Sequence, residues 1–299
     1  MNKPLIITGI NGLLSQNMVK EFVSDHPIYG VDLNPGIYSS QSNIHTSILD
    51  LTNGSAVRDY IGEVAPKAVI HTAAYTNVDR AETEKEIAFK VNAEVPANLG
   101  HICKDLDVPL IHISTDYVFN GENGPYTEYD TVDPRGSYSE SKQAGEQSVL
   151  DSGARAAVIR PNVMYGHGVE LKSSFVEWLI NELKQGKPVN IVDDQYNNPT
   201  YARRLASVIR TILEKSAWDI WHFGSKEVVS RYTFALKIAD TFGLSSELIN
   251  AISTVDLNQA APRPMRSGLI CEKLERELGI PILSIGDELA LLKEEMNVA

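Results

Sequence analysis

The sequence predicts an α/β protein whose parallel sheet is covered by helices on both faces. Through the first half of the 299-residue chain, short apolar runs alternate with segments of helical periodicity. Alternating strands and helices form parallel sheets. The runs are apolar throughout, as strands covered on both faces are. Two glycines, Gly9 and Gly12, follow the first run, where the chain must turn from a strand into a helix.

The apolar runs of the first half define the expected strands, which are Leu5–Thr8, Ile28–Asp32, Ile44–Ile48, Ala68–His71, Pro109–Ser114 and Ala156–Arg160. Between these runs, helical spacing predicts helices at Gly12–Asp25, Ser55–Val64, Glu86–Asp107 and Tyr138–Asp151. Pro96 falls inside the third helix. Because proline has no N–H to donate, it should lie near a helix start or a kink.

The pattern becomes irregular after Pro161. The expected elements are helices at Ser173–Gln185, Tyr201–Lys215, Tyr232–Phe242 and Ile285–Met296, strands at Val189–Val192 and Ile220–Phe223, and a polar loop at Asp193–Pro199. The pattern alone leaves two interpretations of the last quarter open. It forms either a helical cap on the sheet or a small domain that closes over a second ligand.

Composition excludes several classes of function. The net charge of -12 argues against broad nucleic-acid binding, which needs a basic face. Cys103 and Cys271 are far apart, so a disulfide scaffold or a thiolate metal site is not expected, and no other cluster has metal-ligand spacing. No apolar run approaches the eighteen residues of a membrane span, and no signal peptide is visible. The expected location is the cytoplasm.

The turn after the first strand predicts a dinucleotide site. Glycines there let the backbone approach a pyrophosphate at a helix N-terminus, where amides and the helix dipole favour anions. Other candidates follow the next strands, at the sheet edge where ligands bind. The predicted cofactor-binding residues are Gly9, Asn11, Gly12, Leu13, Asp32, Asp50, Leu51, Ala73, Ala74, Tyr75 and Asn92, together with Tyr138 and Lys142. Ser15 stands where a third glycine is usual.

Asp32 ends the second strand, where a carboxylate can accept hydrogen bonds from a ribose diol. The same charge repels a 2′-phosphate. No Arg or Lys follows until Arg58. The sequence therefore favours NADH as the cofactor, with NADPH as the alternative.

A reactive site is predicted where the fifth strand ends. That strand carries Ser114 and Thr115 to the same edge, and helical spacing places Tyr138 and Lys142 on one helix face. A free phenol has a pKa near 10, and a nearby ammonium should lower it. A phenol, an ammonium and a hydroxyl together can protonate a carbonyl oxygen while a hydride reaches the carbon.

Nearly end to end, the chain resembles the extended short-chain dehydrogenase/reductases. The matching motifs are Thr8-Gly-x-x-Gly12, Asp32, His71-Thr-Ala-Ala74, Ser114-Thr115, Tyr138-x-x-x-Lys142 and Arg160-Pro161 followed by Tyr165-Gly166. Within that family it is most similar to the reductases of dTDP-4-dehydrorhamnose. The signatures are Ala73-Ala-Tyr-Thr-Asn-Val-Asp-Arg-Ala-Glu82, Ser114-Thr-Asp-Tyr-Val-Phe-Asn-Gly121, Asp194-Gln-Tyr-Asn-Asn-Pro-Thr200 and Arg263-Pro-Met-Arg-Ser267.

The resemblance implies a Rossmann-type doubly wound sheet with a smaller, mainly C-terminal substrate-binding domain. Residues 1–165 with about 197–223 would bind NAD(H), and about 166–196 with 224–299 would bind a nucleotide sugar. Hydride would pass to C4 of a dTDP-4-keto-6-deoxy sugar, giving dTDP-L-rhamnose, and a homodimer is compatible with this. The implied catalytic residues are Thr115, Tyr138 and Lys142. The implied substrate-binding residues are Thr115, Asp116, Tyr117, Asn162, Gln195, Asn198, Thr200 and Arg263.

Two alternatives stay open at this point. The non-catalytic regulatory subunit of methionine adenosyltransferase resembles the same reductases, so the fold alone does not imply catalysis. Sugar-nucleotide 4,6-dehydratases and 4-epimerases share the family as well. The dehydratases carry an Asp-Glu pair directly after the threonine, whereas here Thr115 is followed by Asp116 and Tyr117. The retained Thr115, Tyr138 and Lys142 favour an enzyme over a subunit that only binds a cofactor.

Overall fold

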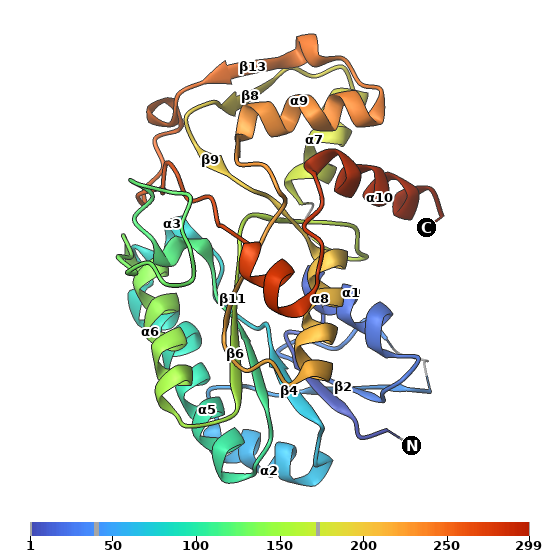
Figure 1. Cartoon of the computed structure of the whole chain (residues 1–299), viewed down its shortest axis with the longest axis vertical. Coiled ribbons are helices and arrows are strands. Elements are labelled where there is room, and N and C mark those ends of the chain that lie inside the picture. The colour runs from blue at the N-terminus through green and yellow to red at the C-terminus, as the bar shows by residue number, and fades with distance from the viewer. Residues whose placement is uncertain (1, 39–41, 172–173, 299) are drawn as a thin grey trace.

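A seven-stranded parallel sheet forms the larger part of the molecule (Figure 1). The computed structural model describes residues 2–38, 42–171 and 174–298. The strands of this sheet are β1 (Leu5–Thr8), β2 (Ile28–Asp32), β3 (Ile44–Ile48), β4 (Ala68–His71), β5 (Leu110–Ile113), β6 (Ala156–Pro161) and β11 (Ile220–Phe223). All of them were expected from their apolar runs, and the predicted fold class is confirmed.

The sheet is covered on both faces because its strands are apolar on both sides. On one face, α1 (Leu13–Phe22) and α8 (Ala202–Lys215) pack together, and their buried side chains join those of alternate strand positions. On the other face lie α2 (Gly54–Val64), α5 (Val95–Asp105) and α6 (Ser137–Asp151). Figure 1 shows these two helical layers on opposite sides of the strands.

The order of the strands creates a crevice at one place. The order is β11-β6-β5-β4-β1-β2-β3. From β1, the chain adds β2 and β3 on one side of that strand and the later strands, beginning with β4, on the other side. In open α/β sheets, ligands bind outside the carboxyl ends of the strands at such a switch point. The ends of β1, β2 and β4 therefore locate the first ligand site.

The long helix expected at Glu86–Asp107 is divided into three parts. They are α4 (Lys85–Phe89), a π-helical turn at Lys90–Glu94 and α5, and Pro96 lies in the first turn of α5 as its missing N–H requires. The π-helical turn allows a close helix contact. A Cβ built on Gly145 of α6 would lie 1.9 Å from the carbonyl oxygen of Asn92, so α6 can approach this turn only through a glycine.

A second core lies in the smaller part of the molecule. It is formed by α7 (Phe175–Lys184), β8 (Val189–Val192), α9 (Arg231–Phe242), β13 (Ile249–Ile252) and α10 (Ile285–Val298). Figure 1 shows these elements together at one end of the molecule. A cap on the sheet would share the sheet's core, so this separate core favours a small domain, and its closing over a second ligand stays a prediction. The exact domain boundaries stay a prediction.

Several elements differ from the expectation. The helix predicted from Ser173 begins at Phe175, and Ser173 itself lies outside the described residues. The strand β13 was not expected, nor were a short helix, α3 (Val78–Ala81), and the two-residue strands β7 (Met164–Tyr165), β9 (Tyr196–Asn197), β10 (Thr200–Tyr201) and β12 (Val229–Ser230). Each of these strands pairs with a strand far away in the sequence, so local sequence patterns do not indicate it.

Among the described residues, none of the helices has the length and apolar character needed to cross a bilayer.

Glu288 of α10 connects that helix to β7 and to the loop after β11. Its carboxylate accepts hydrogen bonds from Ser225 Oγ at 2.6 Å and from the Tyr165 hydroxyl at 3.2 Å, and the residue is only 1% exposed. Burial raises the pKa of this carboxyl from 4.5 to about 7, while the hydrogen bonds from Ser225 and Tyr165 oppose the change.

This pKa predicts how stability depends on pH. Between pH 4.5 and about 7 the unfolded chain is ionised at Glu288 while the folded protein keeps the proton, so the free energy of unfolding falls as pH rises. Glu288→Gln removes this titration. The stability of the variant relative to the unsubstituted protein should rise by on the order of 3 kcal/mol across that window. Parallel curves of unfolding free energy against pH would contradict the assignment.

Candidate active site

The turn between β1 and α1 requires its glycines. Gly9 has a φ of +64°, and a Cβ there would lie 3.0 Å from Cα of Ala73. Gly12 precedes the first residue of α1, and its amide donates to the Gly9 carbonyl at 2.9 Å. The chain thus passes close to the end of β4 and presents the N-terminus of α1 to the crevice. This is the geometry that a diphosphate needs.

A cavity of about 360 Å³ lies at this turn. It brings together seven of the predicted cofactor-binding residues, which are Gly9, Gly12, Asp32, Asp50, Leu51, Ala73 and Ala74. Sequence reasoning missed several other lining residues, namely Leu33, Leu49, Thr52, His71, Thr72, Thr76, Val91 and Val95. The cavity offers apolar side chains to a flat base, a carboxylate to a ribose and a helix N-terminus to a diphosphate. These groups fit the adenosine half of a dinucleotide and its diphosphate.

Two other predicted cofactor residues, Asn11 and Asn92, use their side chains to position backbone. Asn11 donates to the Pro35 carbonyl at 3.2 Å and accepts from the Ile37 amide at 3.3 Å, which holds the segment after β2. Asn92 accepts from the Tyr75 amide at 2.8 Å and donates to its carbonyl at 3.0 Å. Tyr75 in turn donates its hydroxyl to Glu84. Leu13 is the first residue of α1, at the edge of the turn.

Ser15 has a role that glycine would lack. It is fully buried, and its hydroxyl lies 2.7 Å from that of Thr72, which donates to the Thr8 carbonyl. Thr72 also lines the cavity. The serine at the third glycine position therefore ties α1 to the end of β4 beside the cofactor cavity.

The structure brings Thr115, Tyr138 and Lys142 together at the end of β5. The hydroxyl of Thr115 lies near the phenol of Tyr138, close enough to oppose part of the rise in the pKa of that phenol. It also accepts from the Tyr117 amide at 3.2 Å and donates to Asp116 Oδ1 at 3.2 Å. Lys142 Nζ, from the next turn of α6, donates to the Ile113 carbonyl at 2.7 Å. A hydroxyl, a phenol and an ammonium therefore surround the end of one strand, as the sequence predicted.

Ser114 is directed into the protein instead. Its hydroxyl donates to Glu146 Oε2 at 2.7 Å, and Glu146 forms a buried ion pair with Arg160 of β6. Arg160 Nη1 lies 3.2 Å from His222 Nε2, and His222 Nδ1 lies 3.2 Å from the Tyr126 carbonyl. Arginine can only donate, so the His222 proton lies on Nδ1. This network leaves Thr115 as the hydroxyl available to a substrate.

The expected lowering of the Tyr138 pKa is wrong for this structure. Although part of Tyr138 reaches solvent, the surrounding protein raises its pKa, and the Thr115 hydrogen bond opposes that only in part. The Lys142 ammonium is turned toward the Ile113 carbonyl, and burial lowers its pKa to about 8. At neutral pH the phenol therefore keeps its proton and the lysine its charge, which suits a proton donor.

Acidic, aromatic and cationic groups line the other side of this cluster. Burial raises the pKa of the Asp116 carboxyl to about 6, and the Tyr117 ring meets that of Tyr138 edge-on at 5.8 Å. Sequence reasoning missed Arg231, whose charge opposes the rise that burial causes in the pKa values of both Asp116 and Tyr117. Arg231 is the first residue of α9, and within the described residues its buried Nε has no hydrogen-bond partner. Because Arg231 is far from Asp116 in the sequence, only the folded structure shows that it lies near this cluster.

The remaining predicted substrate residues hold the polypeptide together in this structure. Asn198 Nδ2 donates to the carbonyls of Ser225 and Leu269, and its Oδ1 accepts from the Leu269 amide. Thr200 Oγ1 donates to the Phe223 carbonyl and accepts from the Asn162 amide. The Asn162 side chain donates to the Ser267 carbonyl. All three residues are buried, so their role toward a substrate stays a prediction.

Gln195 and Arg263 also bond to other side chains of the protein. Gln195 Nε2 donates to Thr254 Oγ1 at 3.0 Å. Arg263 forms an ion pair with Asp79 at 2.7 Å, which joins the segment after residue 260 to α3. The charge of Arg263 also acts on Tyr117, so it lies near the cluster around Thr115. Both residues stay candidates on the substrate side.

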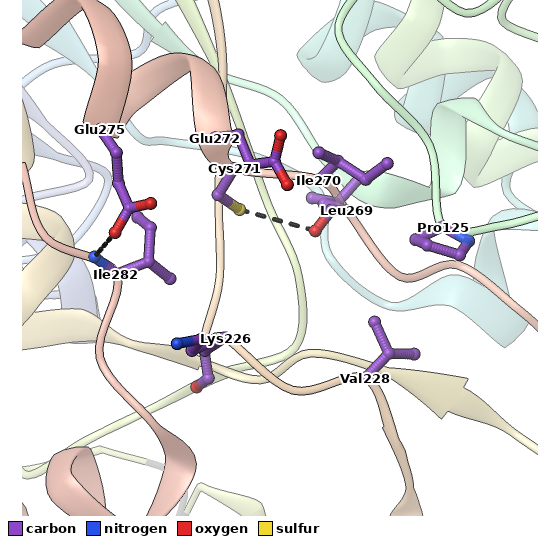
Figure 2. Close-up of a pocket in the computed structure, with 10 residues that line it drawn as sticks. Pro125, Lys226, Val228, Leu269, Ile270, Cys271, Glu272, Glu275 and Ile282 are labelled. Atoms are coloured by element: carbon purple, nitrogen blue, oxygen red, sulfur yellow. Dashed lines mark hydrogen bonds between the residues drawn. The ribbon is translucent and has the colours of Figure 1, made fainter.

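A second cavity, of about 270 Å³, lies between the loop after β11 and residues 269–275 (Figure 2). Cys271 lies at its wall, and its Sγ donates to the Leu269 carbonyl at 3.6 Å. Burial raises the pKa of this thiol, so it is not a thiolate nucleophile at neutral pH. Cys103 is also free and buried. The two cysteines therefore have a packing role, in agreement with their separation in the sequence.

Comparison with known proteins assigns the family. The family model described as "RmlD substrate binding domain" matches residues 2–297, almost the whole chain. The chain belongs to this family. This confirms the resemblance that the sequence motifs indicated.

Proteins with different names are similar to this chain over most of its length. The probable low-salt glycan biosynthesis reductase Agl14 of Haloferax volcanii is 32% identical over 293 residues, which are 96% of each chain. Methionine adenosyltransferase 2 subunit beta of Xenopus laevis is 32% identical over 279 residues, covering 91% of this chain and 81% of that protein. The crystal structure of dTDP-4-dehydrorhamnose reductase from Bacillus anthracis in complex with NADP has a TM-score of 0.90, with 30% identity over 99% of this chain and 100% of that one.

The pKa of Lys142 predicts a pH profile. Below about pH 8 the side chain is an ammonium, and above it the charge is lost. We expect kcat/KM for NADH, which reports groups of the free enzyme, to fall as pH rises through about 8. In Lys142→Arg, whose charge persists, the decline should disappear even if the rate is lower. A profile of the unsubstituted enzyme that is flat to pH 10 would refute the assignment.

The position of Asp32 predicts cofactor preference. Its carboxylate already accepts from the amides of Asn11 and Asn34, each at 3.3 Å, and it lines the cofactor cavity. Asp32→Ala should lower kcat/KM for NADH by about tenfold and reduce discrimination against NADPH, because a charged hydrogen-bond acceptor is lost. Asp32→Asn should retain more of the NADH activity while also relieving the repulsion. A preference of the unsubstituted protein for NADPH would overturn the interpretation.

Proposed function

We propose that this protein is a nicotinamide-dependent reductase that converts the C4 ketone of dTDP-4-dehydrorhamnose to the alcohol of dTDP-L-rhamnose. The observation that carries the proposal is the convergence of Thr115, Tyr138 and Lys142 at the end of β5. β5 is the neighbour of β4, whose end lines the cofactor cavity. NADH is the proposed cofactor, and NADPH is the alternative in view of the NADP complex of the Bacillus anthracis relative.

Each group of the cluster has a chemical task in this reaction. When bound, the reduced nicotinamide supplies a hydride to the carbonyl carbon. Thr115 donates a hydrogen bond to the keto oxygen, giving up its bond to Asp116. Tyr138 donates its proton to the same oxygen as negative charge develops there. Lys142, whose charge is present at neutral pH, holds the nicotinamide ribose and stabilises the tyrosinate that remains.

The substrate side offers groups of the right charge for a nucleotide sugar. Arg231 and Arg263 supply cations near the cluster, and a diphosphate carries negative charge that guanidinium groups bind through paired hydrogen bonds. Asp116 and Tyr117 are placed to contact sugar hydroxyls. The protein's overall charge of -12 does not oppose this, because binding depends on these local cations.

The retained catalytic groups support an enzyme over a regulatory subunit. A subunit that only binds a cofactor has no need of a hydroxyl, a phenol and a buried ammonium placed around the end of one strand. A 4,6-dehydratase is not supported, because the second carboxylate that would follow Asp116 is replaced by Tyr117. An epimerase would recycle its nicotinamide, whereas the proposed reductase consumes it stoichiometrically.

Tyr138→Phe tests the proposal. The substitution removes the proton donor and leaves the ring, so kcat should fall by about three orders of magnitude while the Kd for NADH stays unchanged. NADH oxidation is followed at 340 nm with dTDP-4-keto-6-deoxyglucose and a 3,5-epimerase. Turnover of Tyr138→Phe at the rate of the unsubstituted protein would refute the role of Tyr138. Absence of turnover of the unsubstituted protein with any keto-sugar, despite cofactor binding, would refute the function.

A further inference from the structure

The helix that carries Tyr138 begins without a capping side chain of its own. Its N-cap residue is Gly136, with a φ of +86°, and Tyr138 is the second residue of α6. The first amides of a helix have no partner within the helix. Ser137 is only 1% exposed, so water cannot readily supply that partner. An unpaired amide at this buried position would destabilise the turn that holds Tyr138.

Glu82 supplies the missing partner from far away in the sequence. Its Oε1 accepts from the Ser137 amide at 2.7 Å, and its Oε2 lies 3.3 Å from the Ser137 hydroxyl, which can donate to it. A Cβ on Gly136 would lie 2.7 Å from the same Oε1. The glycine is therefore needed for the carboxylate to reach the helix. A carboxylate at the N-terminus of a 15-residue helix is also favoured by the helix dipole.

Glu82 is itself held in place. It follows α3 directly, and Asp79 of α3 accepts from Arg263 at 2.7 Å and from the Ala261 amide at 3.0 Å. Pro262, between those two residues, is within 3.2 Å of the position of a Gly136 Cβ. Figure 1 shows α3 beside the upper end of α6. Residues 261–263, α3 and the first turn of α6 thus meet around this carboxylate.

We propose that Glu82 is a positioning residue for Tyr138: its carboxylate holds the first turn of α6 so that the phenol stays in register with Thr115. The proposal rests on the proposed function, because it assumes that Tyr138 donates the proton. Displacement of a reacting group by 1 Å can cost about a hundredfold in rate. A cap that fixes the turn carrying that group therefore acts on kcat without touching the substrate.

The test compares Glu82→Ala, Glu82→Gln and a matched control, Ser174→Ala. Ser174 caps α7 through the Glu177 amide, and α7 belongs to the core of the smaller part, away from Tyr138. We expect Glu82→Ala to lower kcat by about tenfold or more while the Kd for NADH changes less than about twofold. Glu82→Gln keeps an acceptor oxygen and should restore most of the rate. Ser174→Ala should lose a cap and stability while kcat is unchanged.

Hydrogen exchange provides a second readout that does not need turnover. In Glu82→Ala, the amides of residues 137–141 should exchange faster, and the rest of α6 should change little. Equal kcat in Glu82→Ala and the unsubstituted enzyme, equal exchange in that turn, or a similar loss of kcat in Ser174→Ala would each overturn the proposal. If the unsubstituted protein reduces no keto-sugar, the proposed function fails, and exchange alone decides whether Glu82 holds the turn.

Discussion

The buried ion pair between Glu146 and Arg160 is the interaction on which the arrangement of the reactive cluster depends. Both side chains are almost fully buried, and each makes further hydrogen bonds, which such a pair needs to offset the loss of hydration. Glu146 lies one turn beyond Lys142 on α6, and it also accepts from Ser114 at the end of β5. The pair therefore fastens the reactive helix to the strand that presents Thr115.

Glycines permit the close contacts around that pair. Gly145 lets α6 approach the π-helical turn at Asn92, and Gly136 lets the Glu82 carboxylate reach the start of the same helix. Gly9 does the same for the end of β4 at the cofactor cavity. A Cβ would collide with the Asn92 carbonyl at Gly145 and with the Glu82 carboxylate at Gly136, and at Gly9 it would make a tight contact in a backbone conformation of positive φ. The helix that carries Tyr138 and Lys142 is thus held at its start, at its middle and through Glu146.

The electrostatics of the cluster follow from its burial. Loss of hydration favours the neutral form of a phenol and of an amine, so the pKa of the partly buried Tyr138 rises and the pKa of the buried Lys142 falls. Sequence reasoning expected the ammonium to dominate and lower the phenol's pKa. The fold instead gives the ammonium a carbonyl partner, Ile113. The resulting state, a neutral phenol beside a charged lysine, is the one that proton donation to a ketone requires.

The sequence by itself determined the sheet, the glycine turn, the carboxylate at the end of β2 and the placement of Thr115, Tyr138 and Lys142 around the end of β5. Those features depend on periodicity and on residues close in the chain, where local sterics and hydrogen bonding decide the outcome. Tertiary structure decided which of the predicted side chains are hydrogen-bonded within the protein and which are available to a ligand. It directed Ser114 to Glu146, engaged Asn162, Asn198 and Thr200 in holding backbone, and brought Arg231 beside Asp116. Partners of this kind lie tens of residues apart, and only the packing of the whole chain brings them within hydrogen-bonding distance.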